Sequence, residues 1–288
     1  MIVQVENDEL NELEEDFYWL TLRQLTELQK QHNLINMDTR TVLSCIRYSD
    51  PTESTTIHPE SASTFEHHVL NSALVDESLA LHELDNIIAW LTQLKTRYHL
   101  NVKMIPLKKV DDWICTPGKI HHKDNKFFSV IGVSVVADSR EVSSWQQPLI
   151  DSIPGGEHAF LCKKFNGVLH FLVQARVEPG NFDALELAPT VQCTSENYQK
   201  EPPFYDRMVG ASDSEVRFRS VQSEEGGRFY HDAHENRIIE LGENESLTIP
   251  FNYIWMTLRQ MKEFIRFNNY FNIEARGLIS CLGIGWTS

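Results

Sequence analysis

The chain has 288 residues, of which 41% are hydrophobic and 10% aromatic, a composition that favours a folded domain with a substantial core over a disordered chain. The 26 basic residues stand against 41 acidic ones, and the formal net charge of −15 argues against partners such as nucleic acid or an anionic membrane, which require a basic surface. No run of about 18 apolar residues occurs, so we expect no membrane span.

Cysteine usage and the N-terminal residues predict a cytoplasmic location. The 5 cysteines are scattered without a C-x-x-C pair, which favours reduced thiols and no metal site. The first residues, MIVQVENDELNELEED, lack the basic and apolar segments of a signal peptide.

The N-terminal part of the chain recurs at its C-terminal end. The stretch FYWLTLRQLTELQKQHNLINMDTRTVLSCI (residues 17–46) aligns without gaps with YIWMTLRQMKEFIRFNNYFNIEARGLISCL (residues 253–282), at an offset of 236 residues (253 − 17). Only one body lies between the copies, so the pattern indicates the closing element of one repeat followed by one complete repeat. We expect Trp19 and its twin Trp255 to pack in a core.

The repeated stretch has the spacing of an amphipathic helix. Leu258, Met261 and Ile265 share one face, which predicts that Lys262 and its neighbouring arginines face outward. A second, short helix is expected to follow, with Asn272 as its N-cap.

The repeat and the composition divide the chain into three parts. Residues 1–48 form a helical segment that duplicates the C-terminal helix, residues 49–70 are a Ser-, Thr- and Pro-rich linker or loop, and residues 71–288 form the body. Within the body we expect a helix over about Val75–Tyr98. The run FFSVIGVSVVA (residues 127–137) has few polar residues on either face and predicts a strand buried on both sides.

Two strands with unusual polar faces follow. In GVLHFLVQARVEPG (residues 167–180), one face is apolar and the other carries His170, Leu172, Gln174, Arg176 and Glu178. LELAPTVQCT (residues 185–194) alternates similarly, so an antiparallel hairpin fits best, with Pro189 at a bulge or an edge. A sheet with one solvated face would give the same pattern, but glutamine and arginine also suit the recognition of oxygen-rich ligands.

A compact polar motif lies further along the chain, in QSEEGGRFYH (residues 222–231). Its paired glycines permit close approach of the backbone to a ligand, and Arg228 could clamp a phosphate. Tyr230 and His231 are candidate proton-transfer groups. No G-x-G-x-x-G, Walker loop or G-x-S-x-G motif occurs, so nothing indicates a nucleotide redox cofactor.

Four stretches together resemble the NDP-hexose 2,3-dehydratase family. They are WQQPLI (residues 145–150), the polar strands through SENY, SEEGGRFYH, and the closing WMTLRQMKEFIRFNNYFNIEARGLIS. The resemblance covers about residues 102–284 and again 17–46. Members usually carry two repeats, each similar to a Nudix-type fold, although the catalytic Nudix box is absent from this sequence.

The resemblance implies an α+β fold with a Nudix-like mixed or antiparallel sheet flanked by helices. It also implies one full repeat plus the closing helix of a second. Because this chain holds only one body, we expect two copies to pair as a homodimer.

The activity that the resemblance implies is that of a hydro-lyase in deoxysugar biosynthesis, acting on dTDP-4-keto-6-deoxyglucose. A base removes the C3 proton, which the C4 ketone acidifies, and the enolate then expels the C2 hydroxyl with the help of an acid. The product is a 3,4-diketo-2,6-dideoxy sugar, which a downstream ketoreductase would consume. The ketone itself accepts the electrons, so no cofactor or metal is expected. The alternative is a non-catalytic dTDP-sugar-binding protein or scaffold.

The candidate site residues follow from these motifs. The catalytic candidates are Glu178, Glu225, Tyr230 and His231, among which the segment 225–231 is favoured for proton transfer. The substrate-binding candidates combine the polar strand face, the glycine motif and, by resemblance, a tryptophan for the thymine ring. They are Trp113, Gln174, Arg176, Thr190, Gln192, Thr194, Asn197, Tyr198, Gly227, Arg228 and Phe229.

Overall fold

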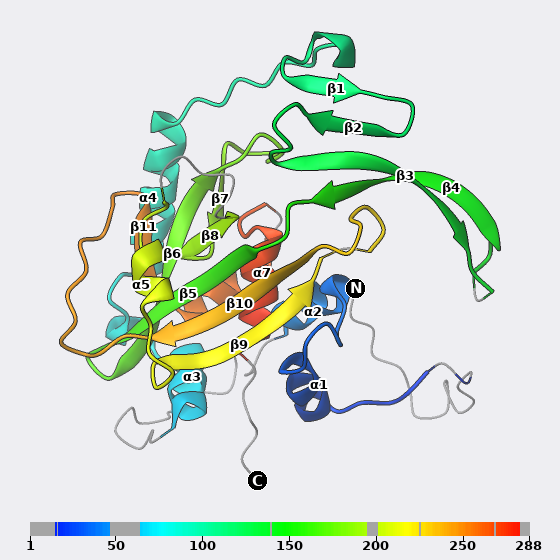
Figure 1. Ribbon diagram of the computed structural model, residues 1–288. Helices are drawn as coiled ribbons and strands as arrows, with labels where there is room; N and C mark the ends of the chain where they lie inside the picture. Colours follow the sequence, from blue (N-terminus) through cyan, green and yellow to red (C-terminus); the bar gives the residue numbers. More distant parts are fainter. Residues whose placement is uncertain are drawn as a thin grey trace.

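The computed structural model describes residues 15, 17–46, 64–138, 140–194, 201–224, 226–267 and 269–282. In this part of the chain a seven-stranded sheet has the order β11-β6-β5-β10-β9, with β7 paired to β6 and β8 paired to β5. A separate four-stranded sheet, β1-β2-β3-β4, projects from one end of it (Figure 1). The pairing of β10 with β5 is parallel and the other pairings are antiparallel, so the α+β fold with a mixed sheet is confirmed.

The elements have the following bounds. The helices are α1 (Leu22–Gln29), α2 (Met37–Ser44), α3 (Phe65–Leu74), α4 (Leu84–Arg97), α5 (Tyr205–Val209), α6 (Leu258–Phe264) and α7 (Ile273–Ser280), with 3-10 turns η2 (Glu77–Leu79) and η3 (Leu107–Lys109). The strands are β1 (Trp113–Cys115), β2 (Lys119–His122), β3 (Phe128–Val136), β4 (Ser144–Ser152), β5 (Gly156–Phe165), β6 (Val168–Val177), β7 (Leu185–Ala188), β8 (Val191–Thr194), β9 (Val216–Ser223), β10 (Ala233–Glu240) and β11 (Tyr253–Thr257).

The large sheet divides where β5 and β6 diverge. Residues 162–165 of β5 pair with β6, whereas residues 156–159 pair with β8. The predicted hairpin is therefore half right: β7 pairs with β6 and sets Glu186 opposite Arg176, but β8 crosses to β5. The chain passes from β7 to β8 at Pro189, which has no N–H group to continue the hydrogen bonding with β6.

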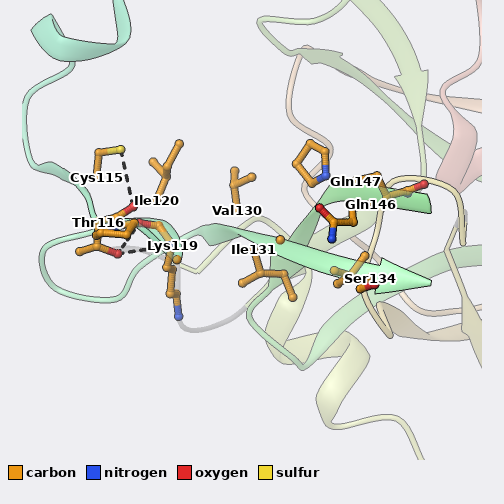
Figure 2. A pocket seen from close by; sticks show the side chains of 14 residues that line it. Cys115, Thr116, Lys119, Ile120, Val130, Ile131, Ser134, Gln146 and Gln147 are labelled. Carbon is orange, nitrogen blue, oxygen red and sulfur yellow. Dashed lines mark hydrogen bonds between the residues drawn. The ribbon is translucent and has the colours of Figure 1, made fainter. Parts of the chain in front are cut away.

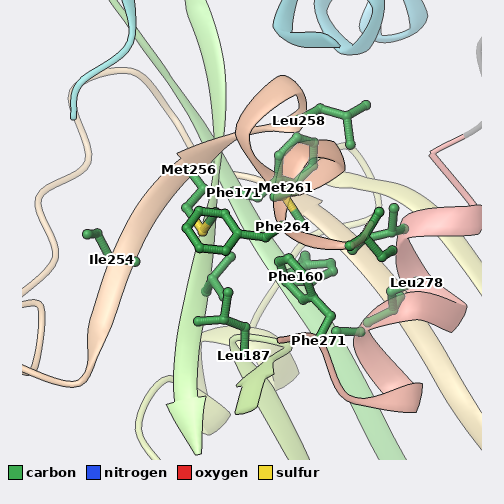
Figure 3. Packing of buried hydrophobic residues seen from close by; sticks show 14 of the residues in the cluster. Phe160, Phe171, Leu187, Ile254, Met256, Leu258, Met261, Phe264, Phe271 and Leu278 are labelled. Carbon is green, nitrogen blue, oxygen red and sulfur yellow. The ribbon is translucent and has the colours of Figure 1, made fainter. Parts of the chain in front are cut away.

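The predicted apolar face of β6 is confirmed. Phe171 and Val173 are fully buried in the main core. The same core contains Met261 of α6 and Leu278 of α7, which Figure 3 shows together with Phe171. The opposite face is also apolar near its start, because Leu172 belongs to a second core. Burying side chains of this size contributes about 1.5–3 kcal/mol each.

The sequence repeat is also a structural repeat. The helices α1 and α6 each begin with a threonine capping box, at Thr21 and Thr257. The helices α2 and α7 each begin at an asparagine N-cap, at Asn36 and Asn272, which confirms the cap predicted at Asn272. The two short helices α2 and α7 pack against each other.

Burial differs between the two copies at some repeated positions. Trp255 is 6% exposed in the second core, whereas Trp19 is 65% exposed, so the core position predicted for Trp19 is wrong. At the first residue of the second helix the order is opposite, with Met37 at 6% and its twin Ile273 at 38%. Burial of a repeated residue therefore depends on what packs against it.

Three other expectations about the helices are corrected. The helix expected over Val75–Tyr98 begins at Leu84, after the 3-10 turn η2, and α3 already occupies the end of the predicted linker. The beginning of the repeated stretch is strand β11 rather than helix. Lys262 faces inward, because its ammonium donates to the Ser44 carbonyl at 2.5 Å and so caps the end of α2.

The strand over residues 127–137 is not buried on both faces. It forms β3 of the small sheet, where side chains alternate between partly buried and exposed and Val136 is 78% exposed. Small and apolar residues on both faces imitate the pattern of a central strand, although no helix in the described residues packs on this sheet.

Candidate functional site

Seven polar side chains meet at the end of the large sheet where β5 and β6 diverge. Because β10 runs parallel to β5, the first residues of both strands lie at this end, together with the last residues of β6 and β9. The N-terminus of α7 reaches the same place through Asn272, whose amide donates to Gln192 Oε1 at 2.8 Å. We call this set the polar cluster: His158, Arg176, Glu178, Glu224, Asp232, His234 and Glu274.

Two histidines form the centre of the cluster. The rings of His158 and His234 lie 4.7 Å apart. His234 also faces two carboxylates, with Nε2 at 3.5 Å from Asp232 and at 3.8 Å from Glu224. The imidazole of His234 therefore lies between a second imidazole and two acids.

A glycine makes room for His234. A Cβ atom added at Gly156 would lie 1.7 Å from His234 Nδ1, so no side chain fits at this position unless the ring moves. The parallel register that pairs His234 with Gly156 explains this close approach. Gly156 thus fixes the distance between the ring and the backbone of β5.

The two histidines have opposite electrostatic environments. Burial lowers the pKa of His158 well below its ordinary value, and the charge of His234 lowers it further. Burial would also lower the pKa of His234, but the hydrogen bond and charge of Asp232 outweigh it, and with Glu224 they raise that pKa. Of the two imidazoles, His234 is therefore the one that binds a proton more readily.

Glu274 contributes a carboxyl group from the first turn of α7. Burial raises its pKa to about 7, and the negative charges of Glu178 and Glu224 add to this effect. A carboxyl that titrates near neutrality can both accept and return a proton at physiological pH. Its charge also raises the pKa of His234, so the two groups are electrostatically coupled.

Arg176 provides the positive charge on the β6 side. Its Nε donates to Glu178 at 2.6 Å and its Nη1 donates to the Gln192 carbonyl at 3.1 Å. These bonds hold the planar guanidinium at the division of the sheet, a geometry suited to oxygen-rich groups.

Buried amides support the cluster from beneath. Asn236 donates to Gln222 Oε1 at 3.1 Å, and Gln222 donates in turn to Cys281 Sγ at 3.3 Å. Asn236 also bonds to His158 and opposes the lowering of its pKa. This chain of amides fixes His158 relative to α7.

Several of the predicted residues come together here. Arg176 and Glu178 belong to the cluster and Gln192 borders it, while Gln174 lies on the same strand face as Arg176. Thr194 lies opposite Gly156 at the same end of the sheet.

Thr190 has a different role from the expected one. It is fully buried, accepts a hydrogen bond from the Leu161 N–H at 3.0 Å, and donates to the Leu172 carbonyl. Its hydroxyl therefore joins strands β5 and β6 where they begin to separate.

The glycine motif lies beside the small sheet instead of in the cluster. The Ile150 N–H donates to the Arg228 carbonyl, and the Tyr230 N–H donates to the Ile150 carbonyl, both at 2.7 Å. Phe229 bridges Ile150, and the ring of Tyr230 stacks on His231 at 4.3 Å. Glu225, Asn197 and Tyr198 lie outside the described residues.

A groove of about 700 Å³ opens on the small sheet (Figure 2). Its lining comes from residues 115–120, 130–134 and 146–148. Trp113 lies two residues before Cys115 and so on the same face of β1. The centroid of its ring lies 4.9 Å from that of the Phe128 ring. Gln147 in the lining donates to the Gly227 carbonyl at 3.0 Å, which connects the groove to the glycine motif.

His158, His234 and Glu274 were not singled out from the sequence. The sequence offers two signals for these residues: a glycine pair before His158, and an acidic residue, Glu274, two positions after the N-cap Asn272. Both signals also have ordinary structural interpretations. Within the described ranges, no group of three His, Cys, Asp or Glu side chains could hold a metal ion. No described helix has the length and apolarity needed to cross a membrane.

Comparison with known proteins relates the chain to sugar-nucleotide enzymes. A family model described as NDP-hexose 2,3-dehydratase matches residues 1–46 and 84–282. A dTDP-4-dehydro-6-deoxy-alpha-D-glucopyranose 2,3-dehydratase of Saccharopolyspora spinosa is 43% identical over 94% of this chain and 56% of its own length. Proteins of the same name from Amycolatopsis orientalis and Streptomyces violaceoruber are 37% and 40% identical, over 98% and 93% of this chain and 55% and 58% of their own lengths. The chain thus spans little more than half the length of these relatives.

Among solved structures, a crystal structure of an ADP compounds hydrolase matches 55% of this chain and 83% of its own, with 15% identity and a TM-score of 0.33. A likeness this weak carries no argument about fold or function.

Proposed function

The chain belongs to the NDP-hexose 2,3-dehydratase family, and from this premise we propose that it is a hydro-lyase acting on a dTDP-linked 4-keto-6-deoxy sugar. The reaction removes the C3 proton and the C2 hydroxyl and yields a 3,4-diketo-2,6-dideoxy sugar. The observation that carries this proposal is the presence of Glu274 and His234 in one cluster, which raises the pKa of both groups. A base and an acid are then both available near neutral pH.

In the first step the Glu274 carboxylate accepts the C3 proton. The neighbouring C4 ketone receives the electron pair as an enolate, so the substrate itself serves as the electron sink. Hydrogen-bond donors at the enolate oxygen contribute about 2.7–4 kcal/mol each in other enzymes. Gln192 is the described candidate for this role, and Asn197 and Tyr198 remain predictions outside the described residues.

In the second step the imidazolium of His234 protonates the C2 hydroxyl, which leaves as water when the enolate electrons form the C2–C3 double bond. Asp232 keeps His234 oriented and protonated through their 3.5 Å contact. Tautomerisation of the enol then gives the diketone. Glu178, predicted as a catalytic residue, has the role of holding Arg176 at 2.6 Å.

Substrate binding is assigned to two places. The fork of Arg176 suits the diphosphate, and the groove beside Trp113 suits the thymine ring. Gly227, Arg228 and Phe229 adjoin the groove through Gln147 and β4. Tyr230 and His231 follow them in the same turn and are the alternative site of proton transfer.

The test is turnover with dTDP-4-keto-6-deoxyglucose in the presence of a competent ketoreductase, which traps the unstable diketone. Mass spectrometry of the sugar nucleotide should show a 2-deoxy product. Failure to form this product, with the reductase shown to be active on authentic diketone, would refute the lyase assignment.

A second function is favoured by the coverage of the relatives. The chain spans 56% of the length of the Saccharopolyspora spinosa protein, and a part of the machinery could bind the sugar nucleotide without turning it over. Calorimetry with dTDP separates the two functions, because the binding protein retains affinity and gives no product.

We also propose that the chain pairs with a second copy. The support is the exposure of the N-terminal twin: Trp19 is 65% exposed and Leu22 is 40% exposed, whereas their buried counterparts lie in the cores. The N-terminal stretch of one copy cannot replace β11 of another, because β11 already occupies that edge of β6. Two copies would therefore join through the exposed faces around Trp19 and Leu22. Sedimentation velocity tests the pairing, and a strictly monomeric active enzyme would contradict it.

A further inference from the structure

We propose that Arg40, from the N-terminal helix pair, is a positioning residue of the polar cluster. It holds the end of β9 that carries Glu224 and supplies a buried positive charge to the carboxylates of the cluster. The proposal rests on the proposed function of the same cluster and extends it to the N-terminal helix pair.

The helix pair α1–α2 lies along β9 and follows it toward the cluster. The Asn33 N–H donates to the Val221 carbonyl at 3.0 Å, and Gln222 donates to the Gln29 carbonyl at 3.4 Å. Arg40 Nη2 then donates to the Ser223 carbonyl at 2.6 Å, immediately before Glu224. The last contact of the helix pair is therefore made at the edge of the proposed site.

Arg40 is buried, with only 2% of its surface exposed. A cation in the interior is unfavourable unless anionic groups compensate it. Burial lowers the pKa of Arg40, and the neighbouring Cys281 and Glu224 oppose that effect. In the other direction, the charge of Arg40 contributes to the low pKa of His158.

The titratable groups around Arg40 come from several elements. Glu224 follows β9, Cys281 ends α7, and His158 lies on β5. Glu224 in turn interacts with His234 and Glu274, and these connect Arg40 to the rest of the cluster, which is Asp232, Glu178 and Arg176.

The repeat provides a matched control within the same molecule. Arg276, the twin of Arg40, closes the same turn: its Nε donates to the Phe271 carbonyl at 3.0 Å, as Arg40 Nη1 donates to the Ile35 carbonyl at 2.7 Å. Arg276 is only partly buried, and the acid on which its charge acts is Glu186. A purely structural role in the turn would be shared by both arginines, whereas a role in the cluster belongs to Arg40 alone.

The experiment compares Arg40→Gln, Arg40→Lys and Arg276→Gln in the full chain. Histidine titration by NMR in the substrate-free protein, with His234 assigned from the signal lost in His234→Asn, is the readout that does not depend on activity. Removing a cation makes the remaining groups easier to protonate, so Arg40→Gln should shift the His234 midpoint upward by ~0.5–1 pH unit. The acid limb of the kcat/KM profile should move in the same direction.

Arg40→Lys retains the charge but loses the planar fork. It should leave both midpoints in place and lower kcat/KM ~10-fold, because an ammonium group holds the Ser223 and Ile35 carbonyls less firmly than the guanidinium does. Arg276→Gln should leave both midpoints unchanged.

An unchanged or lowered His234 midpoint in a folded Arg40→Gln protein would overturn the proposal. If Arg40→Gln does not fold, wild-type kcat/KM in Arg40→Lys would overturn it equally. A protein without lyase activity that still shows the NMR shift would refute the proposed function and leave the role of Arg40 standing.

Discussion

Substitution of Gly156 by alanine tests the geometry of the site directly. The new Cβ would lie 1.7 Å from His234 Nδ1 and 2.5 Å from Cε1, so the ring must retreat by about 1.7 Å to reach the ordinary contact distance of 3.4 Å. That movement disrupts the 3.5 Å contact with Asp232 and the contact with the His158 ring, whose centroid lies 4.7 Å away.

Two consequences of Gly156→Ala can be measured separately. Overpacking of this kind costs ~1–3 kcal/mol of stability. A displacement larger than 1 Å in a catalytic group costs ~100-fold in rate. We therefore expect kcat/KM in the ketoreductase-coupled assay to fall by about that factor, and the His234 pKa to fall as Asp232 loses contact.

The control is Gly242→Ala, just past the end of β10 that lies away from the polar cluster. A Cβ at Gly242 would meet nothing within 4 Å, so this variant should fold normally and retain the catalytic rate. Wild-type kcat/KM and an unaltered His234 titration in Gly156→Ala would refute the reasoning, because the ring would then have no required position.

The remaining predictions concern charge and burial. The pKa of Glu274 is about 7 in the folded protein and 4.5 ordinarily, so its contribution to stability is present below pH 4.5 and is lost as the pH rises through 7. Glu274→Gln should therefore raise the free energy of unfolding by about 3 kcal/mol at pH 8 and leave it unchanged at pH 4.5. Urea denaturation at the two pH values measures the difference. An unchanged pH dependence would place this carboxyl in solvent. Arg176→Lys retains the charge without the fork and should raise KM strongly or abolish activity with folding intact, so unchanged kinetics would place Arg176 outside the site. Trp255→Ala should cost ~3–5 kcal/mol in thermal unfolding. Trp19→Ala should cost less than ~0.5 kcal/mol when the protein is dilute enough to be unpaired, and equal losses would contradict the different burial of the two tryptophans.

Local patterns in the sequence predicted what local physics determines. Alternation in β6 identified the buried face of Phe171 and Val173, and the asparagine before α7 identified its N-cap. The same alternation placed Arg176 on a polar face at the edge of the site. In each case the signal and its structural result lie within a few residues.

The rest depends on contacts between distant parts of the chain. His158 and His234 meet only because two strands pair in parallel, and neither histidine has a neighbour in sequence that indicates the other. Trp19 and Trp255 have matching local sequences, yet only one of them has a sheet to cover it. Periodicity cannot distinguish such twins, because burial is decided by what lies opposite.

The parallel pairing of β10 with β5 has a consequence for how this family could diversify. If β10 ran the other way, His234 would take the place of Ile239, opposite Leu161, and would lie about 10 Å along the sheet from His158 at ~3.3 Å per residue. The chain between the two strands contains β6, β9 and four members of the polar cluster, so changes that keep the imidazole pair in register are confined to the loops that connect these elements.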